Sequence, residues 1–124
     1  MSEPLFDPEG AGITPEVGEF VTLYIDSFIT WELLVFLHDN PEFMGNILDI
    51  TAVLGRDERD VLPAVHAGIE RGFIIAEVKA GETFYWYTPE SERRDRVNAV
   101  MQAAQDTNVR LSIIAQILRR QAEL

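Results

Sequence analysis

The fold is decided by residues 27–89, which read SFITWELLVFLHDNPEFMGNILDITAVLGRDERDVLPAVHAGIERGFIIAEVKAGETFYWYTP. The pattern predicts, in order, a helix, a short helix, a turn, a helix, a strand, a turn and a strand. The first helix is expected over 28–38, because apolar residues recur there at helical spacing and Ser27 can cap its free amides. It ends before Pro41, since the residue that precedes a proline avoids the helical region.

A second, short helix is expected over 46–53, with Ile47, Ile50 and Leu54 on one face. Gly55 follows at the point where the chain must turn sharply, and glycine reaches positive φ at no steric cost. Together with the helix that comes next, this pair of features predicts a helix-turn-helix.

The third helix is expected after Asp57, whose carboxylate can cap its first turn. Its predicted buried stripe consists of Val61, Val65 and Ile69. Pro63 lies within this segment, although proline is comfortable only in the first turn of a helix. The helix therefore either begins near residue 60 or bends at Pro63.

Two runs of strand-favouring residues follow at 73–78 and 83–87, and residues 79–82 between them form a hairpin loop. Tyr85, Trp86 and Tyr87 alternate across the second strand, so two rings point to one side and one to the other. We expect one face to pack on the helices and the other to be partly exposed. A sharper alternative is an aromatic platform for a ligand or partner.

The segments outside this block differ in composition. Residues 1–19 are acidic and rich in proline and glycine, so we expect a flexible arm, and the apolar residues 20–24 lead into the domain. Residues 90–124 are predicted to be helical, because Thr88-Pro89 forms a helix start and no glycine or proline follows. This helix is either unbroken or split in two at the polar residues 105–108.

The C-terminal helix carries an association signal. Apolar and small residues recur at spacings of four and three, the pattern of a coiled-coil seam. One unbroken helix of about 33 residues would be roughly 50 Å long, more than its own domain can cover, so we expect a homodimer; the alternative is a helix folded back on its own core. The candidate dimer residues are Val97, Met101, Ala104, Asn108, Leu111, Ala115 and Leu118.

These elements resemble the winged helix-turn-helix superfamily of bacterial transcriptional regulators, which includes MarR-like and ArsR-like proteins. The resemblance covers residues 27–89. It rests on Ile50, Leu54, Gly55 and Val61 in the helix-turn-helix and on Arg71-Gly72-Phe73-Ile74 at the exit from the third helix. The sequence departs from the usual pattern at Thr51, Arg56 and Gly68, where alanine, an apolar residue and leucine are common.

The resemblance implies a mainly α fold with a small β-hairpin. A winged helix-turn-helix domain would span 20–89, and residues 90–124 would form the dimerisation helix. The third helix would enter the major groove of DNA and the hairpin, or wing, would touch the backbone. The candidate DNA contacts are then Arg59, His66, Arg71, Lys79, Arg93, Arg94 and Arg96.

The charge of the chain argues against DNA binding. The net charge is -11, and Lys79 is the only lysine. The third helix also carries Glu58, Asp60 and Glu70, which repel the phosphates on which most DNA affinity rests. Two functions therefore stay open: a dimeric transcriptional regulator that binds DNA, or a winged-helix module that binds a basic protein partner instead.

Other chemistry has little support in the sequence. The chain has no cysteine, which fits a cytoplasmic protein and excludes thiolate catalysis and cysteine zinc sites. His66 and Glu70 share a helix face, but no third metal ligand is evident. We find no phosphate loop, no nucleophile arrangement and no apolar run long enough for a membrane span. We therefore expect no enzyme, no cofactor, no bound metal and no membrane partner.

Overall fold

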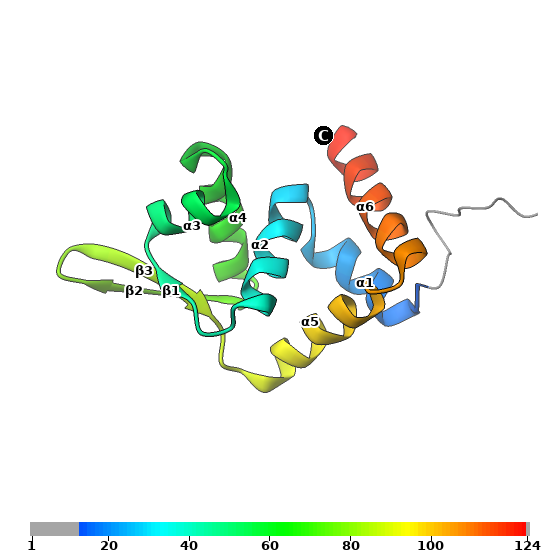
Figure 1. The fold of residues 1–124 in the computed structure, drawn as a ribbon, viewed down its shortest axis with the longest axis horizontal. Helices are drawn as coiled ribbons and strands as arrows, with labels where there is room; N and C mark the ends of the chain where they lie inside the picture. The colour runs from blue at the N-terminus through cyan, green and yellow to red at the C-terminus, as the bar shows by residue number, and fades with distance from the viewer. Residues whose placement is uncertain (1–12, 124) are drawn as a thin grey trace, which may run out of the picture. The chain divides into compact units, whose positions relative to one another are not determined.

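The computed structural model describes residues 13–123 and shows a mainly helical protein with a small antiparallel sheet (Figure 1). Residues 1–12 of the predicted arm lie outside the described residues. The chain divides into two compact units. One contains residues 29–97, and the other, among the described residues, contains 13–28 together with 98–123.

The unit of residues 29–97 contains the predicted order of elements. Its helices and strands are α2 (Phe28–Asp39, from its second residue on), β1 (Met44–Gly45), α3 (Ile47–Leu54), α4 (Glu58–Glu70), β2 (Ile74–Lys79), β3 (Glu82–Tyr87) and the first half of α5 (Ser91–Ala103). The first three predicted helices and both predicted strands are thus confirmed to within one or two residues. The pattern did not reveal β1, because two residues are too few to show an alternation.

The sheet has the strand order β1-β3-β2, and both pairs are antiparallel. Lys79 lies opposite Glu82, so the loop of the hairpin is shorter than predicted and consists of Ala80 and Gly81 alone. Both residues have positive φ, 53° and 79°. Positive φ at the two central positions is the geometry of the type I′ turn, which matches the twist of a hairpin.

Local signals set the ends of α3 and α4. Asn46 caps α3 in a reciprocal capping box with Asp49, and Gly55 ends the helix at φ 64° in the left-handed region. Asp57 occupies the cap position of α4 but makes no side-chain cap hydrogen bond. Since α4 begins at Glu58 and includes Pro63, the alternative start near residue 60 is wrong.

The core of this unit lies between the helices and one face of the sheet. Its buried side chains include Trp31, Leu33, Leu34, Leu37, Ile50, Val61, Val65, Phe73, Ile74, Tyr85 and Tyr87. Of the predicted stripe on α4, Val61 and Val65 are buried and Ile69 is only half-buried. Tyr85 and Tyr87 are buried whereas Trp86 is partly exposed, as the alternation predicted.

Two of the departures from the winged-helix pattern have a structural reason. A Cβ at Gly68 would lie 2.5 Å from Cδ1 of Ile74, so glycine allows α4 to pack closely on β2. Arg56, in the turn between α3 and α4, forms an ion pair of 2.6 Å with Glu32 of α2. A charged residue at this position therefore connects the turn to the first helix of the unit.

The other unit contains α1 (Pro15–Tyr24), the second half of α5 and α6 (Thr107–Ala122). Thr14 caps α1 and Pro15 begins it, so residues 15–19 are helical and do not belong to a flexible arm. Val17 in this stretch is buried. The prediction failed here because it judged residues 1–19 by their proline and glycine content, whereas a proline in the first turn favours a helix.

Residues 90–124 form two helices, not one. The helix α5 ends at Ala103, and Asp106 caps α6 by accepting from the amides of Asn108 and Val109. Near the other end of α6, Arg120 donates to the backbone carbonyls of Val21 and Ile25. This guanidinium satisfies carbonyls at the C-terminal end of α1 and fixes α6 against α1.

Within residues 13–123, no single helix is long and apolar enough to cross a membrane. The helices α1 and α2 reach the required length and composition only when they are counted together across the break between them.

Candidate binding face

The third helix and the hairpin, which would face DNA in a winged helix, expose mostly acidic residues. We call the exposed charged residues of α4, β2 and β3 the α4–hairpin face. Its carboxylates are Glu58, Asp60, Glu70, Glu77 and Glu82, and its exposed cations are Arg59 and Lys79. Five carboxylates against two cations give this face a negative charge, and His66 is also exposed on it.

Three of the predicted DNA contacts lie on this face. Arg59 is 85% exposed and its Nη2 lies 3.7 Å from the carboxylate of Asp57. His66 points outward from the middle of α4, and Lys79 lies beside the turn of the hairpin. These side chains can reach a ligand, but Arg59 lies between Glu58 and Asp60, and Lys79 lies close to Glu77 and Glu82.

Arg93 is held by the backbone where α4 joins the sheet. Its Nη1 donates to the carbonyl oxygen of Arg71 at 2.9 Å, and its Nε lies 3.2 Å from the carboxylate of Glu90. The guanidinium also lies 5.9 Å from the ring centroid of Phe73. Its Nε and Nη1 are therefore used inside the unit. The predicted contact Arg71 is itself half-buried.

Arg94 connects two distant loops of the same unit. Its Nε donates to the carbonyl oxygen of Thr88 at 2.6 Å and its Nη2 to that of Pro41 at 3.3 Å. The guanidinium lies 4.7 Å from the ring centroid of Tyr87. Arg94 thus fixes the end of β3 to the loop after α2, while Arg96, the third arginine of this cluster, is half-buried.

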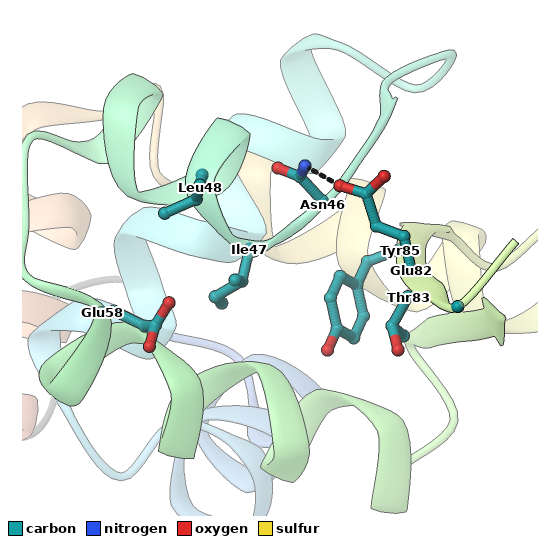
Figure 2. A pocket seen from close by; sticks show the side chains of 8 residues that line it. Asn46, Ile47, Leu48, Glu58, Glu82, Thr83 and Tyr85 are labelled. Carbon is teal, nitrogen blue, oxygen red and sulfur yellow. Dashed lines mark hydrogen bonds between the residues drawn. The ribbon is translucent and has the colours of Figure 1, made fainter. Parts of the chain in front are cut away.

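A pocket of about 350 Å³ opens where α3, α4 and the hairpin meet (Figure 2). Its lining residues are Asn46, Ile47, Leu48, Glu58, Gly81, Glu82, Thr83 and Tyr85. The amide of Asn46 donates to the carboxylate of Glu82, so the residue that caps α3 also holds the hairpin. Sequence reasoning missed this pocket, because Asn46 and Glu82 are 36 residues apart and no sequence pattern connects them.

Tyr85 forms one wall of the pocket. The residue is 8% exposed, and its hydroxyl makes no hydrogen bond with any other residue in the part of the chain that the structure describes. In Figure 2 this hydroxyl points the same way as that of Thr83, toward the space bordered by Glu58. The only fully buried, unpartnered side-chain polar atom of the described residues is the hydroxyl of Tyr87, so the hydroxyl of Tyr85 is open to the pocket and a ligand there can hydrogen-bond to it.

The predicted dimer residues divide into two groups. Val97, Met101 and Ala104 are buried within the chain. Leu111 and Leu118 of α6 remain 46% and 50% exposed, Asn108 is exposed and Ala115 is half-buried. These four residues lie on the side of α6 opposite Ile113 and Ile117, which are buried. We call them the outer face of α6.

Comparison with protein-family models, with curated proteins and with solved structures finds no match for this chain. Among residues 13–123, no three histidine, aspartate or glutamate side chains are grouped so that they could hold a metal ion. The assignment of a function therefore depends on the charges, contacts and pocket described above.

Proposed function

We propose that this protein is a dimeric winged-helix interaction module whose α4–hairpin face binds a basic segment of a partner protein, not duplex DNA. The observation that carries the proposal is the negative charge of that face, five carboxylates against two exposed cations. The winged-helix assignment is supported by the order of α2, α3, α4, β2 and β3, with Gly55 at the sharp turn.

The need to neutralise phosphates argues against DNA as the ligand. Affinity for duplex DNA depends on lysines and arginines that replace condensed counterions. Of the seven predicted contacts, Arg93 and Arg94 donate to backbone carbonyls of their own unit. The exposed cations that remain on the face are outnumbered by carboxylates that repel the DNA backbone.

The same surface suits a basic protein. Opposite charges across an interface speed association and select the partner. Apolar side chains are also exposed beside the carboxylates: Leu48 of α3 is 64% exposed and Val78 of β2 is 66% exposed. Such side chains add apolar contact area, which a polypeptide partner can cover.

Direct DNA binding by a transcriptional regulator is the second candidate. It is favoured by the resemblance of residues 27–89 to winged-helix regulators and by the exposure of Arg59 on α4 and Lys79 on the hairpin. In a dimer, these side chains of two copies would contact DNA together.

The dimer is proposed to form through the outer face of α6. Leu111, Ala115 and Leu118 provide an apolar stripe that the described residues leave exposed or half-buried, and Asn108 at its end can fix the register. A helix that is apolar on two sides has a second side to bury, and a second copy of α6 offers the same stripe.

The test compares two labelled probes by fluorescence anisotropy at low salt: a decapeptide of alternating lysine and glycine, and a random-sequence DNA duplex. We expect the full chain at micromolar concentration to bind the peptide, with an affinity that falls as salt is added, and to leave the duplex unbound. Strongly salt-dependent binding of the duplex without binding of the peptide would establish the second candidate instead.

A further inference from the structure

The pocket between α3, α4 and the hairpin has the features of a site for one charged side chain. Its volume of about 350 Å³ is roughly ten times the ~30 Å³ that a water molecule occupies, which is room for a long side chain. We propose that this pocket receives a lysine or arginine side chain of the basic partner, with the cationic end between Glu58 and Glu82. This inference rests on the proposed function and names the subsite within it.

The charge of the pocket is one-sided. Glu58 from the first turn of α4 and Glu82 from the start of β3 both line it, and no lysine or arginine does. The hydrogen bond from Asn46 holds the carboxylate of Glu82 in place. Two carboxylates from different elements therefore border the same space, and a cation placed there is attracted by both.

Tyr85 supplies a second, independent feature. The residue is 8% exposed and lines the pocket, and its hydroxyl is open to the pocket and makes no hydrogen bond with another residue among 13–123. A phenolic oxygen can accept from an ammonium or guanidinium group. The hydroxyl of Thr83 lies on the same side of the hairpin, because the two residues are two apart on one strand.

The remaining walls are apolar. Ile47 and Leu48 of α3 line the pocket, and Leu48 is largely exposed. Lysine and arginine combine a polar end with an apolar stem, which packs along apolar surface while the end stays among polar groups. The combination of apolar walls with carboxylates and hydroxyls fits such a side chain better than it fits a bare metal ion, which prefers a shell of oxygen ligands.

The experiment uses the full chain and the labelled lysine–glycine peptide, with a second peptide in which acetyl-lysine replaces lysine. The variants are Glu58→Gln and Tyr85→Phe, which keep the size of the side chain. Glu70→Gln is the matched control, because it removes the same charge from another exposed position of α4 that does not line the pocket. Amide spectra of each variant report whether it is folded.

We expect Glu58→Gln and Tyr85→Phe each to weaken peptide binding about three- to fivefold, the size of one exposed ion pair or hydrogen bond, and Glu70→Gln to change it less than twofold. The peptide should shift the amide resonances of residues 46–48 and 81–85, and the acetylated peptide should not. Lysine with blocked amino and carboxyl termini should shift the same resonances at higher concentration. If spermidine shifts these resonances and blocked lysine does not, the pocket is a site for free polyamines, and the proposal is overturned.

The peptide titrations distinguish failure of the subsite from failure of the proposed function. If the lysine peptide binds the wild-type chain, but the two pocket variants bind it as tightly as Glu70→Gln does, the subsite is wrong and the proposed function stands. If the wild-type chain does not bind the peptide, the proposed function fails and the subsite fails with it.

Discussion

The guanidinium of Arg93 donates a hydrogen bond to the carbonyl oxygen of Arg71 at 2.9 Å, across the exit from α4 into the sheet. Gly72 follows Arg71 at φ 81°, and a Cβ there would lie 2.7 Å from Cζ of Arg93. An arginine that the sequence placed among the DNA contacts is thus packed against the backbone. The positive φ is what favours glycine at this turn, and the hydrogen bond to the backbone makes Arg93 less suited to bind phosphate.

Gly72→Ala is expected to destabilise the fold by more than Gly81→Ala does. Both glycines have positive φ, which costs an alanine about 1 kcal/mol, but only the Cβ at Gly72 meets a neighbour. Urea unfolding measures both costs. In an Arg93→Ala background, Gly72→Ala and Gly81→Ala should lower the free energy of unfolding equally. If Gly72→Ala still costs more, the contact with Arg93 is not the cause of the difference.

Tyr87→Phe should leave stability unchanged or raise it by about 1 kcal/mol, because the hydroxyl of Tyr87 is buried without a hydrogen-bond partner in the described part of the chain. The ring that lies under Arg94 is kept. Chemical unfolding at pH 7 measures the change. A loss of several kcal/mol would mean that the hydroxyl has a strong partner.

The same tyrosine predicts a pH dependence. Burial raises the pKa of Tyr87 from 10.0 to about 12, although Arg94 opposes the shift. Folding therefore favours the neutral phenol, and its contribution to stability is complete below pH 10 and is lost as the pH rises toward 12. The free energy of unfolding should fall more steeply over this range in wild type than in Tyr87→Phe. Equal slopes would contradict the raised pKa.

Leu111→Glu combined with Leu118→Glu is expected to convert a dimer into a folded monomer, because both side chains are about half exposed on α6 and a charge would be buried at the interface. Sedimentation equilibrium of the full chain measures the mass. Gln105→Glu is the control, since it adds a charge at an exposed position between the helices. A wild-type chain that sediments as a monomer would refute the dimer.

Much of the fold could be predicted from the sequence because its signals are local. Gly55, Asn46 and the strand-favouring run of β3 each act within a few residues, so the order of the elements was predicted correctly. The strand β1 and the helical start at Pro15 were missed, the first because it is too short to show a pattern and the second because the same residue type can begin or end a helix.

The candidate site was harder to predict, because charge alone does not show which arginines are free. Arg93 and Arg59 look alike in the sequence, yet Arg93 donates to a carbonyl 22 residues away while Arg59 is 85% exposed. The pocket depends on a contact between Asn46 and Glu82 that only the tertiary fold creates. The negative charge of α4, in contrast, could be predicted from the sequence alone.

The central claim is that the charge of the α4–hairpin face decides what it binds. The most direct measurement compares the affinity of a random-sequence DNA duplex for the wild-type chain and for the triple variant Glu58→Lys, Asp60→Lys and Glu70→Lys, by anisotropy at low salt. The account predicts no binding by wild type at micromolar concentration and salt-dependent binding by the variant, which also loses the lysine peptide. Equally tight DNA binding by both chains would contradict it.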